Sequence, residues 1–335
     1  MFISKNRLEQ EHGMLNRLAV GLMNEGEQVT RVLPHFDGDT PPDFEKAVSL
    51  IPKFHTQFSL PFLQRNEIIL TLSNALKKAK ITSIVAFGHE TLQLSIAVAS
   101  ILEVPIYQEI ISMLEAKRVK KNAPVTRWIG ATPSIERAIT ERVGEGRSAL
   151  MPLGVATIGE HIASDCNPTT FIAILQASDD PKSTTKLLHA LKAYPNTHIF
   201  LELDGKNDHK IWSAVEEANL LERTTCLQNI AALRSLIIET DLVILPSSQM
   251  PVRTVLLEAM ACGVPVLANK IAGFDMLIDG ETALIATGSW EGPLKTILGD
   301  HDLRSRLSLA ATSLVATNYG SAAQIDAFQA AVTPL

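Results

Sequence analysis

The sequence has only three cysteines, Cys166, Cys226 and Cys262, which are far apart and odd in number. A disulfide framework needs more cysteines, and a zinc knuckle needs them in close pairs. These requirements exclude a disulfide-stapled domain and a cysteine-rich metal site, and we expect no bound metal. Unpaired cysteines are typical of a reducing compartment, so we expect a cytoplasmic protein.

Long apolar runs and an excess of basic charge are missing as well. No uninterrupted run of about 18 apolar residues occurs, and residues 1–13 lack the apolar centre of a signal peptide. The net charge of -6 gives no general attraction to nucleic acid. We therefore expect neither a membrane-spanning helix nor a nucleic-acid partner.

One dense basic run, residues 117–121 (KRVKK), has two interpretations. The first is the solvated end of a helix, which is the ordinary place for such a run. The second is a contact with a membrane surface or an acceptor, because clustered lysines and arginines attract anionic groups. The sequence favours the first and keeps peripheral membrane contact as the alternative.

Several well-known catalytic motifs are absent. The sequence has no GxxxxGK phosphate loop, no GxGxxG after the first predicted strand, no HExxH and no GxSxG. These absences argue against P-loop nucleotide hydrolysis, dinucleotide-dependent redox chemistry, zinc proteolysis and hydrolysis at a nucleophile elbow. No cofactor is implied.

The length and the pattern of the chain predict two α/β domains. At 335 residues, with 46% hydrophobic residues, the chain can bury two cores. Short β-branched runs alternate with stretches of helical period, which is typical of a mostly parallel sheet. Strands are expected at 2–4, 28–33, 83–87, 104–108, 126–131, 147–152, 171–177, 198–203, 241–246 and 264–269. Helices are expected at 13–25, 183–193, 208–219, 252–262 and, in two pieces, 302–333.

Two segments interrupt the alternation. Residues 34–61 contain five prolines and weak periodicity, so we expect a loop with a short helix that supplies acceptor contacts. Residues 156–169 gather polar turn residues and are the best candidate for a linker. We therefore expect an N-terminal domain at 1–160 and a C-terminal domain at 161–315. A final helix is expected at 316–335, and one alternative is that it crosses back to the N-terminal domain.

The most informative segment is 241–285, DLVILPSSQMPVRTVLLEAMACGVPVLANKIAGFDMLIDGETALI. A strand ends at Pro246, Pro251 stands where a first helical turn accepts a residue without an N–H, and Gly263 is a usual helix end. The N-terminus of this helix offers N–H groups and a partial positive charge suited to a phosphate. Two facing doubly wound domains leave a cleft at the carboxyl ends of their strands, where ligands of such folds bind.

This segment resembles the donor-binding core of family 4 retaining glycosyltransferases of the GT-B fold. The resemblance is carried by PS, LLEAMACGVPV, a later glycine and IDGETALI. Residues 11–29 are similar to the family's first loop and helix, and residues 131–155 to its domain-closing segment, so nearly the whole chain is covered. The resemblance implies two facing Rossmann-like domains with a central cleft, a nucleotide-sugar donor and metal-independent catalysis by support of the leaving nucleotide.

In that family two glutamates separated by seven residues bracket the donor helix. Glu258 matches the second, which the resemblance implies holds the ribose hydroxyls; a surface glutamate is the alternative. Met250 stands at the first position, which meets the donor sugar, and it has no charge. Thr254 and Val255, in the first turn of the same helix, complete this part of the predicted donor site.

The family also opens its second domain with an arginine and a lysine that clamp the donor pyrophosphate. Lys182 stands at the lysine position, with a solvated loop lysine as the alternative, but Ala177 replaces the arginine. Arg253 lies where the family has a glycine. We hypothesise that Arg253 supplies the missing charge.

The first domain contributes weaker candidates. The family often places a histidine after the strand that begins at a VP pair, but residues 104–112 contain none. His89, at the end of an earlier predicted strand, is our candidate catalytic residue facing the sugar; a buried or capping histidine is the alternative. His12 and Gly13 fall in the predicted first strand-helix loop, residues 9–13, where the resemblance implies contact with phosphate or acceptor.

The leading hypothesis is transfer of a sugar, with retention, from a nucleotide sugar to a carbohydrate or lipid-linked acceptor. Because two motif residues are replaced, the alternative is a catalytically silent relative that keeps the fold as a binding or partner module. An epimerase or another GT-B enzyme acting on nucleotide sugars is a third interpretation. Sequence spacing identifies neither the sugar, the base nor the acceptor.

Overall fold

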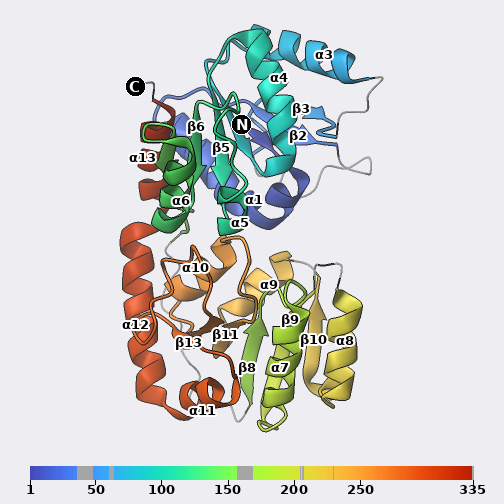
Figure 1. Ribbon diagram of the computed structural model, residues 1–335, viewed down its shortest axis with the longest axis vertical. Helices are drawn as coiled ribbons and strands as arrows, with labels where there is room; N and C mark the ends of the chain where they lie inside the picture. The colour runs from blue at the N-terminus through green and yellow to red at the C-terminus, as the bar shows by residue number, and fades with distance from the viewer. Residues whose placement is uncertain are drawn as a thin grey trace. The chain divides into compact units, whose positions relative to one another are not determined.

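The computed structural model describes residues 1–35, 48–59, 64–156, 169–203, 205, 207–228 and 230–333. The chain forms two compact units (Figure 1): Met1–Gly154 with Ser321–Leu335, and Val155–Gly320. We call them unit 1 and unit 2. The predicted domain boundary at 160, and most of the predicted linker, lie outside the described residues.

Unit 1 is built on a seven-stranded parallel sheet with the strand order β3-β2-β1-β4-β5-β6-β7. The strands are β1 (Phe2–Ile3), β2 (Arg31–Pro34), β3 (Lys53–Thr56), β4 (Ile84–Phe87), β5 (Ile106–Ile110), β6 (Arg127–Gly130) and β7 (Ser148–Leu150). Every residue of β2, β4, β5 and β6 is buried, as expected for parallel strands covered on both faces. The carboxyl ends of the strands share one edge of the sheet.

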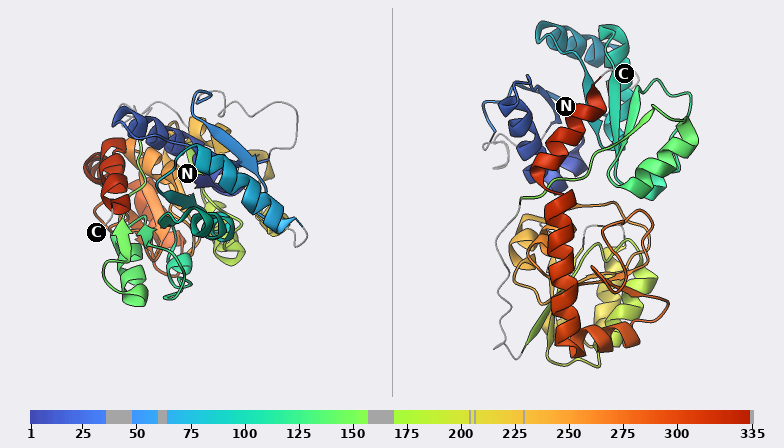
Figure 2. Two further views of the ribbon diagram at one scale, coloured as in Figure 1. Left: turned by 90° about the horizontal axis from the view of Figure 1, so that it is seen from above. Right: turned by 90° about the vertical axis from the view of Figure 1, so that its left-hand side faces the viewer.

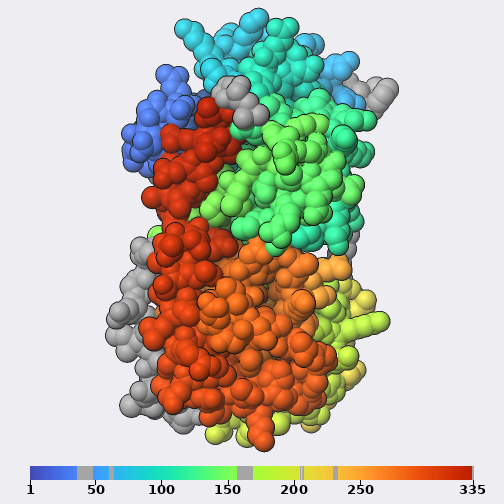
Figure 3. Space-filling view, turned by 60° about the vertical axis from the view of Figure 1, so that its left-hand side comes forward, coloured from blue at the N-terminus to red at the C-terminus, as the bar shows by residue number. Residues whose placement is uncertain are grey.

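Helices join the strands of unit 1. They are α1 (Lys5–Asn24), α3 (Arg65–Lys78), the short 3₁₀ helix η1 (His89–Thr91), α4 (Leu92–Leu102), α5 (Met113–Ala116), α6 (Pro133–Val143) and α13 (Ser321–Val332). Although α13 follows unit 2 in the chain, it packs against α1, and the two lie side by side in Figures 2 and 3. Its end is held by Arg127 Nη1, which donates to the Ala331 carbonyl at 2.9 Å.

Unit 2 repeats the architecture with a six-stranded parallel sheet in the order β10-β9-β8-β11-β12-β13. The strands are β8 (Thr170–Ile174), β9 (Thr197–Glu202), β10 (Thr224–Leu227), β11 (Leu242–Leu245), β12 (Val266–Asn269) and β13 (Leu284–Ala286). The helices are α7 (Pro181–Leu191), α8 (Asp208–Glu217), η2 (Leu221–Arg223), α9 (Ile230–Ile237), α10 (Thr254–Ala261), α11 (Glu291–Gly299) and α12 (His301–Asn318). Two parallel sheets with flanking helices confirm the predicted α/β class.

The beginning of unit 1 differs from the sequence prediction. Ser4 caps α1 by accepting a hydrogen bond from the Arg7 N–H at 3.3 Å, so the helix begins at Lys5 rather than at residue 13. Residues 9–13 therefore lie within α1, and the predicted loop there is wrong. The helix bends at Glu11 (φ -130°, ψ 21°), where two helical pieces meet.

The predicted excursion at 34–61 is corrected in part. Lys53–Thr56 form strand β3, which pairs along its whole length with β2 at the edge of the sheet. An edge strand tolerates the partly exposed Lys53 and Phe54 that hide the alternation of the pattern. Residues 36–47 and 60–63 lie outside the described part of the chain.

Candidate functional site

The loops at the carboxyl edge of the unit 2 sheet are tied to one another. Asn269, the last residue of β12, donates from Nδ2 to the Pro246 carbonyl after β11 and to Ser183 Oγ on α7 at 2.9 Å. Asp180 caps α7 by accepting from the Ser183 N–H at 3.1 Å. In doubly wound folds this edge is where ligands bind.

Helix α10 begins at this edge, directly after the β11 loop. Its side chains are buried from Thr254 to Ala261, with Glu258 as the one exception. It ends where Gly263 takes a φ of 80°, a left-handed conformation that favours glycine. Arg253 occupies the N-cap position without capping the helix through its side chain. The helix is thus fixed in the core and presents an uncapped N-terminus at the carboxyl edge.

Arg253 is buried, with its side chain 3% exposed, and it forms an ion pair with Glu202 at the end of β9. The Nη1–Oε1 distance is 2.7 Å. The second oxygen of Glu202 accepts the Gln176 N–H at 2.8 Å, so the pair also fixes the loop after β8. Within the described residues, Arg253 Nε and Nη2 are buried and have no hydrogen-bond partner.

Glu258 is also engaged. Its Oε2 forms an ion pair with Nη1 of Arg234 on α9, and Arg234 Nη2 donates to Thr254 Oγ1 at 2.8 Å. Arg234 carries no motif, and its place 24 residues before Glu258 gives no signal that sequence reasoning could use. Glu202, 51 residues before Arg253, was missed for the same reason.

The remaining donor-site candidates lie around α10 and the first turn of α7. Met250 is buried in the loop before α10, and Val255 is buried within the helix. Lys182 is exposed in the first turn of α7 and forms no hydrogen bond or ion pair with the described residues. Ala177 is buried, and Gln176 before it has a φ of 49°. Met250, Arg253, Thr254, Val255 and Glu258 are thus gathered on one short stretch of unit 2.

The candidates of the first domain all lie in unit 1. His89 opens η1 directly after β4, is exposed, and follows Gly88, whose φ is 87°. His12 and Gly13 lie within α1 and are half-buried. A Cβ on Gly13 would meet Arg17 only at an ordinary contact distance of 3.5 Å, so local packing does not require glycine there.

A buried ionic cluster lies at the carboxyl edge of the unit 1 sheet. Arg7 of α1 forms a two-point pair with Glu109 of β5, with Nε–Oε2 and Nη2–Oε1 distances of 2.9 and 2.7 Å. Glu11 approaches the same guanidinium at 3.8 Å. Burial raises the pKa of Glu109 against the opposing charge of Arg7. The cluster joins the kinked helix α1 to the middle of the sheet.

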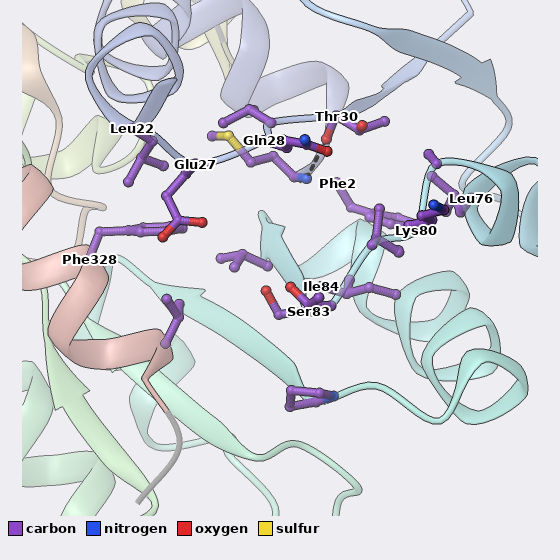
Figure 4. A pocket seen from close by; sticks show the side chains of 18 of the residues that line it. Phe2, Leu22, Glu27, Gln28, Thr30, Leu76, Lys80, Ser83, Ile84 and Phe328 are labelled. Atoms are coloured by element: carbon purple, nitrogen blue, oxygen red, sulfur yellow. Dashed lines mark hydrogen bonds between the residues drawn. The ribbon is translucent and has the colours of Figure 1, made fainter. Parts of the chain in front are cut away.

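A cavity of about 810 Å³ lies at the opposite, amino edge of the unit 1 sheet (Figure 4). Phe2, Leu22 and Phe328 contribute apolar surface to its lining, and Glu27 and Lys80 contribute charge. Because doubly wound folds bind ligands at the carboxyl edge, we do not assign the catalytic chemistry to this cavity.

The basic run forms a structured surface of unit 1. Lys117, Arg118, Lys120 and Lys121 are all exposed after α5. Arg147 donates from Nη2 to the Ala123 and Val125 carbonyls, at 2.9 and 2.7 Å, and Arg142 Nε donates to the Val119 carbonyl at 3.1 Å. The run is therefore the exposed end that follows α5, in agreement with the first interpretation, and its backbone accepts hydrogen bonds from Arg142 at Val119 and from Arg147 at Lys121.

The described residues contain no group of three or more histidine, cysteine, aspartate or glutamate side chains placed to hold a metal ion. Among the described helices, none combines the length and apolar character needed to cross a bilayer.

Comparison with known sequences connects unit 2 to a family. Residues 171–298 match the family described as Glycosyl transferases group 1. A D-inositol 3-phosphate glycosyltransferase of Paenarthrobacter aurescens (strain TC1) is 30% identical over 149 residues, which are 41% of this chain and 36% of that protein. One from Nocardia farcinica (strain IFM 10152) is 37% identical over 78 residues, 22% of this chain and 17% of that protein. The chain spans about a third or less of the length of these curated relatives.

Comparison with solved structures covers both units. Anabaena Alr3699/HepE in complex with UDP and glucose has a TM-score of 0.77 at 15% identity, with 100% of both chains covered. A sucrose-phosphate synthase of Thermosynechococcus elongatus has a TM-score of 0.74 at 19% identity, covering 94% of this chain and 91% of that one. At such identities the likeness shows the fold. This chain therefore has the GT-B fold, and its residues 171–298 match the family described as Glycosyl transferases group 1.

Proposed function

We propose that this protein is a retaining glycosyltransferase that takes a sugar from a nucleotide-sugar donor. The observation that carries the proposal is the start of α10, where an uncapped helix N-terminus and the buried guanidinium of Arg253 adjoin. Two guanidinium nitrogens that are buried and have no hydrogen-bond partner among the described residues are unusual in a folded core, and guanidinium N–H groups suit an anion such as a diphosphate. The match of residues 171–298 to group 1 glycosyl transferases supports the same assignment.

In this proposal each residue of the α10 region has one role. The diphosphate lies at the N-terminus of α10, close to Thr254 and Val255, with Arg253 behind it and Lys182 reaching it from α7. Glu258 accepts hydrogen bonds from the ribose hydroxyls. Met250 borders the sugar without a charged contact.

The reaction breaks the bond between the anomeric carbon and the phosphate oxygen. The bonding electrons leave on the nucleoside diphosphate, an acceptor oxygen bonds to the same face of that carbon, and the acceptor proton passes to the released phosphate. The positive groups around the diphosphate stabilise the negative charge that develops on it. The residues named require neither a metal nor a cofactor for this step.

The acceptor is proposed to be a carbohydrate or a lipid-linked sugar that unit 1 binds in the cytoplasm. His89 is the candidate that faces the sugar, and His12 and Gly13 are candidates near the acceptor. The exposed basic run after α5 offers a peripheral contact with an anionic membrane, where a lipid-linked acceptor resides.

A binding module without turnover is the second candidate function. Specific observations favour it: Met250 and Ala177 are buried apolar residues, while Glu258 and Arg253 are each held in an internal ion pair. A site whose charges are satisfied internally has less reason to stabilise a transition state.

Calorimetric titration with UDP-, GDP- and ADP-sugars tests the proposal, with Glu258→Ala as the comparison. We expect one donor to bind and its affinity to fall at least tenfold in Glu258→Ala. Slow release of free sugar from that donor would support transfer over the binding module. If no donor binds to the wild-type protein, the proposed function is wrong.

A further inference from the structure

Glu258 is held from outside its own helix. Arg234 spans one turn of α10, because two of its partners, Thr254 and Glu258, are four residues apart on the same face. The Arg234 and Glu258 side chains are 18% and 12% exposed, so both are largely withdrawn from water while keeping some access to it. Arg234 itself belongs to α9, which precedes β11 in the chain.

This arrangement restricts the orientation of the Glu258 carboxylate. A glutamate side chain near the surface has many rotamers, and ordering it to accept hydrogen bonds opposes binding. A guanidinium is a rigid planar fork, so one that is anchored at two points limits the carboxylate to few orientations. The neighbouring hydroxyl of Thr254 provides that second anchor.

We propose that Arg234 is a positioning residue for the nucleotide. It fixes the Glu258 carboxylate in the orientation that accepts the ribose hydroxyls, and so it sets the preference for a ribonucleotide over a deoxyribonucleotide. The proposal rests on the proposed function, in which Glu258 receives those hydroxyls. Arg234 itself does not contact the nucleotide in this assignment, in contrast to Lys182 and Arg253.

A purely structural role for Arg234 is the rival explanation. In that case the ion pair only joins α9 to α10, and its removal would lower stability and weaken all nucleotides by the same factor. Positioning of Glu258 instead acts on the ribose alone. The two roles therefore differ in the ratio of affinities for nucleotides that differ only in a ribose hydroxyl.

The experiment measures that ratio by calorimetry. UDP, GDP and ADP are first compared on the wild-type protein. The nucleotide that binds most tightly then serves as the probe, together with its 2′-deoxy and 3′-deoxy forms. Hydrogen bonds to a charged group predict a wild-type preference for the ribose form of about 10- to 100-fold. We expect Arg234→Gln to reduce the preference to below about threefold while it weakens the deoxy forms by less than about twofold. Glu258→Gln should give the same pattern.

Two further variants keep the test decisive. Arg234→Lys retains a cation opposite Glu258 without the planar fork, and we expect it to restore part of the preference. Arg304→Gln is the matched control, because Arg304 also lies in unit 2 and donates to backbone carbonyls of Ile297 and Leu298 at 2.8 Å, away from α10. It should leave the preference unchanged.

The outcomes separate this inference from the function on which it rests. If the wild-type protein binds none of the nucleotides, the proposed function fails. If it binds with a clear ribose preference that Arg234→Gln leaves intact, or if that variant weakens ribose and deoxy forms equally, Arg234 has only a structural role. The Arg234→Lys variant answers the same question should Arg234→Gln not fold.

Discussion

Two arginines near α10, Arg253 at its N-cap and Arg234 on α9, form internal ion pairs, and both pairs join segments that are distant in sequence. Arg253 meets Glu202 from β9, and Arg234 meets Glu258. A buried pair is favourable only when its hydrogen bonds compensate for the lost hydration. The Glu202 carboxylate meets this condition through two donors, the Arg253 guanidinium and the Gln176 N–H.

The Arg253–Glu202 pair makes a prediction for stability. Arg253→Ala leaves Glu202 buried without its cation, so we expect unit 2 to lose about 3–5 kcal/mol of unfolding free energy. Replacing both residues by apolar ones, as in Arg253→Met with Glu202→Leu, should restore part of it, since no buried charge remains although the Gln176 N–H loses its acceptor. Urea unfolding followed by fluorescence of the buried Trp290 measures both variants. A loss below about 1 kcal/mol for Arg253→Ala would contradict the buried pair.

The thiol of Cys262 offers a second test at the end of α10. Its side chain is 3% exposed, and its pKa is raised by burial and, secondarily, by the negative charge of Glu258. The pKa of Cys226 is raised as well, by burial and secondarily by the charge of Asp208, so access separates the two thiols. We expect buried Cys262 to react far more slowly than half-buried Cys226 with a disulfide reagent at pH 8. Thiol titration in a Cys166→Ser background would count the two.

The Glu258 charge can be separated from burial in that measurement. Removing the charge by Glu258→Gln removes the smaller of the two causes, so the pKa of Cys262 should move down and its labelling rate at a fixed pH should rise moderately. Burial remains, so the rate should stay below that of Cys226. Equal rates for the two thiols in the native protein would mean that the end of α10 opens readily.

At the scale of elements, regular parts of the chain were predictable and irregular ones were not. The buried strands β4 and β11 gave unbroken apolar runs, and so did β8 after Thr170. The helices α12 and α13 gave a helical pattern broken at the Gly320 region. The start of α1 was hidden because Arg7 and Glu11 are buried as an ionic cluster, which reads as a polar loop.

Prediction of the candidate site from the sequence was limited in the same way. The sequence predicted this helix at 252–262 with Pro251 in its first turn, whereas α10 begins at Thr254 and Pro251 lies in the loop before it. The position of Glu258 followed from the resemblance. The ion-pair partners in this region, Glu202 and Arg234, come from other elements and are set by tertiary packing, which has no short-range signal. The extent to which the site is internally paired therefore required the structure.

We predict that the basic segment after α5 binds anionic membranes and that its positive charge alone determines the strength of this binding. Lys117→Ser, Lys120→Ser and Lys121→Ser together remove three exposed cations, each worth about 1 kcal/mol near an anionic surface. We expect the triple variant to bind vesicles containing 30% phosphatidylserine at least tenfold more weakly than the wild-type protein does. Neutral phosphatidylcholine vesicles should bind neither protein.

A matched control exists on another element. Lys77 and Lys78 in the last turn of α3, with Lys80 after it, are exposed and carry the same total charge. Their replacement by serine changes the net charge equally, so equal losses in the two triple variants would attribute the binding to net charge rather than to the segment after α5. Cosedimentation at two salt concentrations measures both.

At the scale of the whole molecule, each unit has its own core and its own buried tryptophan. Trp128 lies in β6 of unit 1, and Trp290 lies in the core of unit 2 next to Leu294. With the exposed Trp212 replaced by phenylalanine, one variant retaining only Trp128 and one retaining only Trp290 report the two units separately. A protein of two units need not unfold in a single transition, so the two reporters must be measured apart.

These reporters decide where the nucleotide binds. The charged residues that contact the donor in the proposal all lie in unit 2; they are Lys182, Arg253 and Glu258. A ligand that binds only the folded form stabilises it by about 2.7 kcal/mol at 100 times its dissociation constant. We therefore expect a nucleoside diphosphate at that concentration to shift the Trp290 unfolding transition by about this amount and the Trp128 transition by much less. A shift confined to Trp128 would move the nucleotide to unit 1 and would overturn the assignment of the α10 residues. Equal shifts of the Trp290 and Trp128 transitions would mean that each unit binds the ligand or that the two units unfold together. Glu258→Ala would then separate these two explanations, since it removes the shift only if ligand binding depends on unit 2.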